Sequence, residues 1–408
     1  MTAHTPLATR GARVLSSLAI GLVAGCFCGA SSFAFLDLLG RATAFRTTHD
    51  GIVWALPLAG LAMGLVYERA GRSVTAGTDL VIDRMAAGGA EIPWLMAPLV
   101  LVGTVTTHLF GGSAGREGTA VQLGATLSDF LAHRLGLGAR ERHACLVAGV
   151  AGGFGSVFGT PVAGAVFALE CVHARRITLG DAVPASVAAL VGDFVARSMG
   201  VKHAEYSDVV LPAMTFADLG RWLAVAVAVA AAVMLFVDLT HALRKRSEGI
   251  LPRLPFRMFV GGVLVVALWR IFGTSAYLGL SDELVARALV DRNLPVFAFA
   301  MKLVFTALTL GVGFVGGEVT PLFVVGATLG NVLARTLGLP LDATVAVCFA
   351  SVFGVAARTP VALAVLAAEL FGPAIMPYVL AVSATAGALT GSRALYESQR
   401  DASSQGEG

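Results

Sequence analysis

Two acidic residues stand in glycine-rich stretches of an otherwise strongly apolar chain. Glu117 lies in the stretch 111–119, and Glu318 lies at what the sequence aligns as the equivalent position, in the stretch 316–321. A charged, unpaired carboxylate is costly at membrane depth, and burial favours its protonated form. We therefore interpret Glu117 and Glu318 as residues of a proton or ion pathway. The alternative interpretation is that each caps the helix that follows it.

The glycines point to an anion site. Glycines just before a helix leave backbone N–H groups accessible, and the helix dipole adds partial positive charge there. Gly115 to Thr119 and Gly316 to Thr320 have this form, and residues 76–79 open a third such segment. We expect these helix N-termini to converge on an anion, with the glutamates able to compete for the same place. Close helix packing is the alternative explanation of any one glycine-rich turn.

A serine hydrolase is a remote alternative. Gly111, Ser113 and Gly115 fit the G-x-S-x-G pattern of a nucleophilic serine, and His108 lies nearby. That motif requires a strand-turn-helix context in an α/β sheet. The composition of this chain does not provide such a context, so an intramembrane serine hydrolase is not favoured.

The composition places these residues in a membrane. Of 408 residues, 56% are apolar and 13% are charged, and the mean hydropathy is +0.80. A soluble domain usually carries about 25% charged residues, so the polar surface is too small for one. At roughly 20 residues per helical pass, the chain allows about ten to fifteen passes.

The net charge of +3 is small and scattered, which argues against a nucleic-acid partner. Five cysteines in apolar runs indicate neither a disulfide framework nor a zinc site, and no cofactor is expected.

Apolar runs predict fourteen helical segments. They lie near 14–38, 51–67, 94–110, 119–132, 144–156, 161–173, 182–199, 218–240, 256–272, 295–314, 321–336, 343–356, 360–372 and 374–391. Several are shorter than a full span and contain glycines, which predicts broken or half-crossing helices that line a polar cavity.

The chain also repeats itself. Residues 160–170 recur at 359–369 with eight identities in eleven positions, and the 117–127 region recurs at 318–329. We therefore expect a first membrane repeat at 14–200, a linker at 201–214 and a second repeat at 215–395, flanked by the terminal segments 1–13 and 396–408. Paired repeats with interrupted helices are typical of secondary transporters, whose site lies between the halves.

Three stretches resemble one known family. Residues 115–119 resemble the gating-glutamate loop of the CLC chloride channel and transporter family. Residues 153–170 are similar to the glycine- and proline-bearing helix pair that follows it, and residues 302–323 to the segment before the third anion-coordinating helix. The resemblance covers essentially the whole chain. Chloride-handling members usually carry apolar residues where Glu318 and Thr320 stand, so this chain looks like the CLC-F branch, the fluoride/proton antiporters.

The resemblance implies an architecture and a function. It implies an all-α polytopic membrane protein with a CLC-type fold of two repeated, inverted halves and no CBS domains in its tail. It further implies a homodimer with one pathway per subunit, embedded in membrane lipid, that exchanges fluoride for protons and is not an enzyme. Arg10 and Arg13 favour a cytoplasmic N-terminus in the inner membrane. A chloride channel or chloride/proton exchanger of the same family is the alternative function.

The resemblance also implies roles for single residues. Glu117 would be the mobile, proton-carrying gate, and Glu318 would assist coupling. The implied anion-binding residues are Gly77, Thr78, Gly115, Arg116, Gly118, Glu318, Val319 and Thr320, together with Tyr396, whose hydroxyl would close the intracellular side.

Two positions depart from the family pattern. Fluoride members commonly have asparagine or methionine in the first loop, where this chain has Thr78 and Asp79. Many chloride exchangers have an intracellular proton glutamate where this chain has Cys171, so proton coupling here cannot use that position.

Hydroxyl and N–H donors placed closely around the ion suit fluoride, which is small and strongly hydrated.

Overall fold

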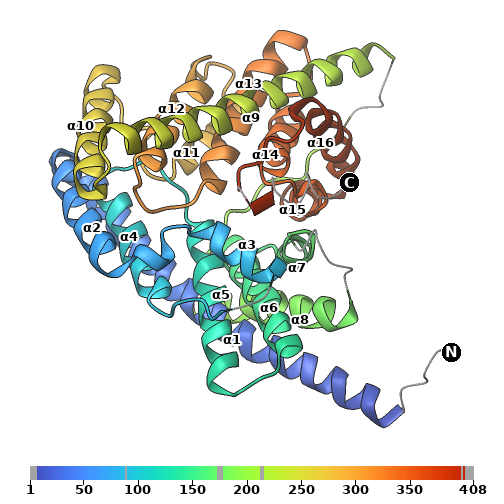
Figure 1. Cartoon of the computed structure of the whole chain (residues 1–408). Coiled ribbons are helices and arrows are strands. Elements are labelled where there is room, and N and C mark those ends of the chain that lie inside the picture. The colour runs from blue at the N-terminus through green and yellow to red at the C-terminus, as the bar shows by residue number, and fades with distance from the viewer. Residues whose placement is uncertain (1–6, 88–89, 172–177, 212–215, 397, 400–408) are drawn as a thin grey trace. The chain divides into compact units, whose positions relative to one another are not determined.

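The computed structural model describes residues 7–87, 90–171, 178–211, 216–396 and 398–399 (Figure 1). Within these residues the chain forms sixteen α-helices, three short 3-10 helices and no regular strand. The α-helices are α1 Leu7–Thr48, α2 Leu56–Ala70, α3 Thr78–Ala87, α4 Met96–Leu109, α5 Glu117–Arg134, α6 Ala139–Phe158, α7 Pro161–Glu170, α8 Leu179–Ser198, α9 Phe216–Ile250, α10 Leu254–Phe272, α11 Asp282–Val290, α12 Ala298–Gly311, α13 Val319–Leu337, α14 Leu341–Ala356, α15 Pro360–Phe371 and α16 Met376–Thr390.

Seven segments are long and apolar enough to cross a membrane, counting only described residues. They are Val14–Thr48, Asp50–Ala70, Leu179–Ser198, Asp218–Ile250, Leu254–Phe272, Val319–Leu337 and Pro373–Thr390. Five further apolar helices have between 10 and 17 residues: α4, α7, α12, α14 and α15. A full crossing takes roughly 20 residues, so these five are the short, interrupted elements that the glycine-rich sequence predicts.

Each of the fourteen predicted segments overlaps an observed helix, but two helices were not predicted from apolar runs. α3 was marked only by the loop that opens it, and α11 falls in the polar stretch 281–293. Both are amphipathic, so an apolar-run criterion passes over them. α9 also continues to Ile250, beyond the predicted end at 240. Of the expected terminal segments, residues 1–6, 397 and 400–408 lie outside the described part, and the repeat boundaries remain a prediction.

The chain forms two compact units that interleave along the sequence. The first unit comprises residues 1–36, 76–97 and 120–204. In it, α6 packs against α3, α7 and α8. Gly21, Gly25 and Gly29 of α1 face α8 so closely that a Cβ at any of them would lie within 3.0 Å of it. Small residues at four-residue spacing permit this close approach of helices in membranes.

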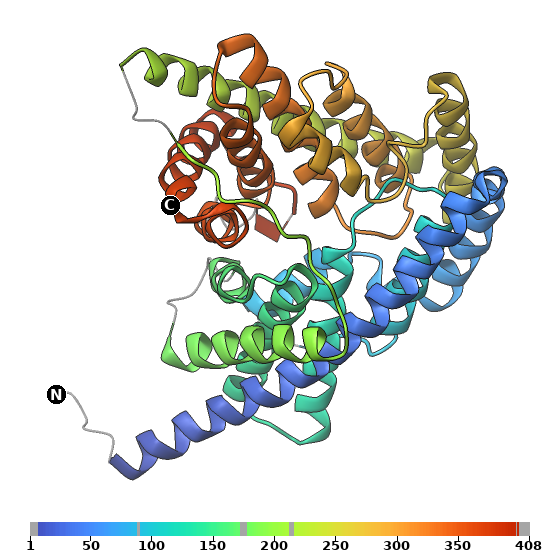
Figure 2. The same ribbon diagram turned by 180° about the vertical axis from the view of Figure 1, so that it is seen from behind.

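The second unit comprises residues 37–75, 98–119 and 205–408. Here α13 packs between α12 and α14, and α15 and α16 pack against α14. The long helix α9 lies along α12, α14 and α16, and α10 packs against α2 (Figures 1 and 2). This unit contains the loops before α5 and α13, and therefore both glutamates of interest.

The same series of elements occurs twice. A loop opens α5 and α13, then follow α6 and α14, and then the proline-initiated helices α7 and α15. Thr160 and Thr359 precede the two prolines with similar backbone angles, φ −124° and −127°. Before them, Gly159 has φ +76°, and Arg358 takes the matching position with φ +54°. A residue other than glycine is uncommon at positive φ. The two copies therefore share the conformation of this turn, although their residues differ.

Candidate functional site

The loops that precede α5 and α13 are joined by an antiparallel bridge in the second unit. Gly115 N donates to Gly317 O at 2.6 Å, and Gly317 N donates to Gly115 O at 2.9 Å. This is the one β-bridge in the described part of the chain. It brings two helix N-termini together from positions far apart in the sequence.

Glycine is needed for this approach. A Cβ on Gly115 would lie 2.8 Å from Pro321 Cδ and 3.0 Å from Gly317 O. A Cβ on Gly316 would lie 2.4 Å from that of Ala114. Any larger side chain would force the loops apart, so the glycines of the two motifs serve close packing as well as access to the backbone.

Glu117 is the first residue of α5, and its side chain is 1% exposed. Its Oε2 accepts hydrogen bonds from the backbone N–H of Thr320 at 3.1 Å and of Arg116 at 3.2 Å. Its Oε1 accepts from the Thr320 hydroxyl. The Arg116 guanidinium adds an ion-pair contact of 3.4 Å between Nε and Oε1, with its own side chain 27% exposed.

The carboxylate of Glu117 therefore occupies donors of the kind that bind small anions. Thr320 lies in the first turn of α13, where N–H groups have no intrahelical partner and the dipole is positive. The hydroxyl and the backbone N–H of Thr320 both donate to the carboxylate of Glu117. The carboxylate oxygens are anionic acceptors, so donors of this kind also suit an inorganic anion.

The structure changes the alignment of the two glutamates by one residue. Gly115 is bridged to Gly317, so Arg116 and Glu318 occupy matching positions, and Glu117 matches Val319, the first residue of α13. Glu318 is the N-cap residue of α13 and is half-buried. Glu117 is thus the first helical residue of α5, whereas Glu318 precedes the first helical residue of α13. The predicted equivalence of the two glutamates was wrong.

Gly118 lies beside the bridge, because a Cβ on Gly317 would lie 3.0 Å from the backbone nitrogen of Gly118.

The charge of Arg116 also affects the pKa of Tyr206. Burial, together with the charge of Asp282 and against the opposing charge of the Arg116 guanidinium, raises the pKa of the Tyr206 phenol to about 12. The phenol is therefore protonated at physiological pH.

Gly77 and Thr78 belong to the first unit. Gly77 has φ +58°, and Thr78 opens α3 and is buried. The Thr78 hydroxyl accepts a hydrogen bond from Gln122 Nε2 at 3.0 Å. Gln122 is itself buried on α5, five residues after Glu117. Sequence reasoning missed Gln122, although an amide in an apolar helix was a signal for it.

Tyr396 lies near the end of α14, because its neighbour Leu395 donates its N–H to Ala356 O at 2.8 Å. Its side chain is 3% exposed. Val319 is also buried, at the start of α13. The roles of both residues in anion binding remain predictions.

Three polar residues of α12 hold the 111–116 loop. Lys302, Thr306 and Thr309 are spaced by four and three residues, which places them on one helix face. Ser113 Oγ lies 3.0 Å from Lys302 Nζ and 2.9 Å from Thr306 Oγ1, and Ser113 N donates to Thr309 Oγ1 at 3.2 Å. Sequence reasoning missed this stripe, although a lysine inside an apolar helix signals a specific role.

These contacts contradict the hydrolase alternative. Both ring nitrogens of His108 contact backbone oxygens, those of Thr104 and Ala114, rather than Ser113. Lys302 Nζ contacts three oxygens, Ser113 Oγ, Gly279 O and Ser281 Oγ, so it links the 111–116 loop to the 279–281 segment. No strand precedes the loop in the described residues.

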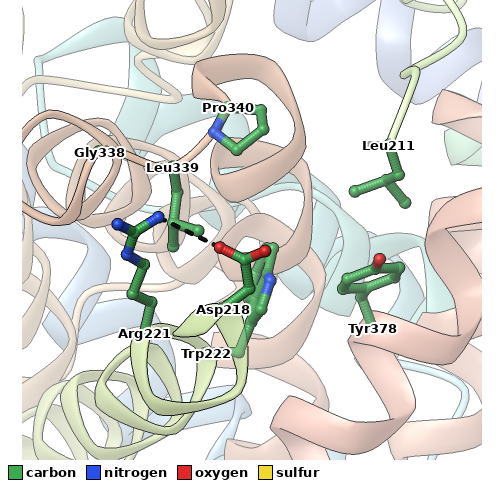
Figure 3. Close-up of a pocket in the computed structure, with 8 residues that line it drawn as sticks. All are labelled: Leu211, Asp218, Arg221, Trp222, Gly338, Leu339, Pro340 and Tyr378. Carbon is green, nitrogen blue, oxygen red and sulfur yellow. Dashed lines mark hydrogen bonds and ion pairs between the residues drawn. The ribbon is translucent and has the colours of Figure 1, made fainter. Parts of the chain in front are cut away.

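A pocket of about 420 Å³ lies elsewhere in the second unit (Figure 3). Asp218, Arg221 and Trp222 of α9 face Tyr378 of α16 across it, and Arg221 pairs with Asp218 at 3.1 Å. The remaining lining residues are Leu211, Gly338, Leu339 and Pro340. None of the candidate site residues lines this pocket, and its aromatic and ionic groups are typical of a membrane interface.

A sequence model of the voltage gated chloride channel family matches residues 59–391. This chain therefore belongs to that family, which comprises the CLC channels and transporters. The all-α CLC-type fold of two repeated halves predicted from the sequence is confirmed.

The relatives include fluoride-handling proteins. The "Chloride/fluoride channel protein" of Pseudomonas syringae pv. tomato is 41% identical over 391 residues, which is 93% of this chain and 85% of that protein. The crystal structure of a CLC-type fluoride/proton antiporter matches with a TM-score of 0.90 and 31% identity, covering 97% of this chain and 99% of that one. A slow cyanobacterial Cl⁻/H⁺ antiporter shares the fold at 15% identity, with a TM-score of 0.81 over 97% and 99% of the two chains.

Proposed function

We propose that this chain is a fluoride/proton antiporter that exports fluoride from the cell and thereby confers fluoride resistance. The observation that carries the proposal is the pair of hydrogen bonds from Thr320 to the buried carboxylate of Glu117. The similarity to a fluoride/proton antiporter over nearly the whole length of both chains supports it.

The contacts suggest how a proton and an anion are exchanged. Ionised Glu117 uses the Thr320 donors, and an anion has to displace it to use the same donors. Protonation removes the charge of the carboxyl group and weakens the charge-assisted hydrogen bonds it accepts. The neutral side chain then leaves the donors to the incoming anion. Because burial excludes water, one occupant replaces the other rather than both staying.

Fluoride fits these donors for a physical reason. It is small and holds its water molecules firmly, so a site must offer several short hydrogen bonds in exchange. Thr320 supplies an N–H and an O–H from one residue, and Arg116 supplies a further N–H. An apolar residue in place of Thr320 would lack the hydroxyl.

The remaining predicted residues take supporting roles in this proposal. Gly115 and Gly118 allow the backbone to approach the ion, and Val319 offers the first N–H of α13. Glu318, half-buried beside Val319, assists proton coupling. Thr78 and Gly77 take part in anion binding, and Tyr396 closes the intracellular side.

We further propose that the protein is a homodimer with one pathway per subunit, in lipid of the cell's inner membrane and with a cytoplasmic N-terminus. The seven apolar spans support a membrane location, and Arg10 and Arg13 before the first span support the orientation.

Paired flux measurements test the ion assignment. Proteoliposomes loaded with equal concentrations of fluoride and chloride are assayed with ion-selective electrodes, and protein-free liposomes give the leak. We expect fluoride to leave much faster than chloride. Equal efflux of both ions would refute the fluoride assignment and favour a chloride channel or exchanger of the same family.

A further inference from the structure

A cluster of basic side chains lies in the same unit as Glu117. Arg46 is in the last turn of α1 and is 6% exposed. Within the described residues its guanidinium makes no hydrogen bond and no ion pair, and its Nε is fully enclosed. A buried cation without partners is strongly unfavourable, so the site needs a compensating group.

The neighbours of Arg46 are basic as well. Gly279 connects them: a Cβ built there would lie 3.0 Å from Arg46 Nη2 and 3.8 Å from His108 Cδ2. The carbonyl oxygen of the same glycine accepts a hydrogen bond from Lys302 Nζ at 2.7 Å. Lys302 and His108 are both fully buried. A guanidinium, a lysine amine and an imidazole thus lie around one glycine.

Nearby acids do not neutralise these cations. The acidic groups whose charge acts on Arg46 and Lys302 are Asp50 and Asp282. Both are exposed to solvent, where their influence is screened. Neither forms an ion pair with Arg46 or Lys302 in the described part of the chain.

His108, which lies beside Gly279, contacts two backbone oxygens. Its Nδ1 lies 2.8 Å from Thr104 O and its Nε2 lies 3.0 Å from Ala114 O. A neutral ring has one N–H and satisfies only one of these acceptors, whereas a protonated ring donates to both.

We propose that Arg46 is the ligand of a second site for a small inorganic anion, separate from the site at Glu117 and Thr320. The free N–H groups of Arg46 supply the hydrogen bonds. Lys302, which donates to Gly279 O, lies beside the same glycine. Gly279, with φ +62° and no side chain, lets the backbone approach Arg46 closely, since a Cβ there would lie 3.0 Å from Arg46 Nη2.

This site is linked to the 111–116 loop. Gly279 N donates to Gly112 O at 3.1 Å, and Lys302 holds Ser113. An anion beside Arg46 therefore lies next to the segments that support the loop before Glu117, where it would raise the local concentration of the transported ion. That the ion is transported rests on the proposed function, whereas its binding does not.

Calorimetric titration of the detergent-solubilised chain tests the site. Sodium fluoride is titrated in one arm and sodium chloride in the other, with sodium gluconate as the blank. We expect Arg46→Gln to bind one anion fewer per chain than the wild type in at least one arm. Thr320→Val should bind the other anion more weakly, and the double variant should combine both effects. Arg41→Gln, an exposed arginine one turn earlier on α1 that pairs with Asp37, is the matched control and should bind as the wild type does.

A milder variant keeps the test decisive if Arg46→Gln does not fold. Arg46→Lys retains the charge but not the planar donor fork, so we expect a dissociation constant raised about tenfold at that site. Unchanged stoichiometry and affinity in Arg46→Gln, or unchanged affinity in Arg46→Lys, would overturn the proposal. Equal fluoride and chloride fluxes in proteoliposomes would instead overturn the proposed function and leave the Arg46 site standing.

Discussion

Thr320 donates both its backbone N–H and its hydroxyl to the carboxylate of Glu117, a residue that precedes it by 203 positions. The contact depends on the bridge between Gly115 and Gly317, which sets the two helix N-termini against each other. One residue thus binds both oxygens of a buried acid, and the two glycine-rich motifs act as a single site.

Removal of the Thr320 hydroxyl should weaken fluoride binding while leaving the fold intact. A hydrogen bond to a charged acceptor contributes about 1.5–3 kcal/mol, so Thr320→Val should raise the fluoride concentration for half-maximal transport by about 10- to 100-fold. Thr320→Ser keeps the hydroxyl and should stay near the wild type. Thr336→Val, at an exposed position of the same helix, is the control. Initial rates against fluoride concentration in proteoliposomes measure the effect, and an unchanged half-maximal concentration in Thr320→Val would contradict it.

Gly115→Ala should separate the two loops. The new methyl group would meet Pro321 Cδ at 2.8 Å and Gly317 O at 3.0 Å, and overpacking of this kind costs about 1–3 kcal/mol. We expect a lower midpoint of thermal unfolding in detergent and slower fluoride transport. Gly220→Ala, in open space on α9, should not lower the midpoint, because alanine favours the helix. Equal midpoints for Gly115→Ala and the wild type would show that the approach of the loops is not tight.

Ser113→Ala should impair transport by loosening the 111–116 loop. It deprives Lys302 and Thr306 of a buried partner, which costs about 1–3 kcal/mol. Fluoride flux should fall, and thermal stability should fall with it. Treatment of the wild type with a fluorophosphonate probe should leave Ser113 unlabelled. Labelling that disappears in Ser113→Ala would restore the hydrolase interpretation.

The two turns at residues 159 and 358 should respond differently to substitution. Gly159→Ala places a Cβ 2.4 Å from His203 Cγ at a positive φ, so we expect a clear loss of thermal stability. Arg358→Gly relieves a positive φ worth about 1–2 kcal/mol but loses the hydrogen bond from Arg358 to Gly391 O, so the net change should be small. A large loss in Arg358→Gly would mean that its side chain, rather than the turn, stabilises this region.

Much of the fold was predictable because it follows from local signals. Apolar runs marked the long helices, and the recurrence of residues 160–170 at 359–369 marked matching proline-initiated helices, which the structure shows as α7 and α15. α3 and α11 escaped because amphipathic helices lack a continuous apolar run. The polar residues of these two helices suggest loops in the sequence. Their helical structure becomes evident only once the neighbouring helices that cover their apolar faces are known.

The site was predictable in its parts but not in its register. The glycines, Glu117 and Thr320 follow from the rule that helix N-termini bind anions. The pairing of Glu117 with Glu318 failed by one residue, because sequence identity aligned the acids whereas the bridge aligns Gly115 with Gly317. Arg46 and Lys302 are far apart in the sequence, and only tertiary packing around Gly279 brings them together.

Proton-driven fluoride movement through wild type and Glu117→Gln tests the role of Glu117 most directly. Proteoliposomes are given equal fluoride on both sides and a pH gradient, and a fluoride electrode follows the external concentration. Wild type and Glu283→Gln, an exposed acid on α11, should both move fluoride against its own gradient toward the acidic side. Glu117→Gln, which cannot carry the proton, should not. Uphill fluoride movement that persists in Glu117→Gln would contradict the assignment of this carboxyl group as the gate.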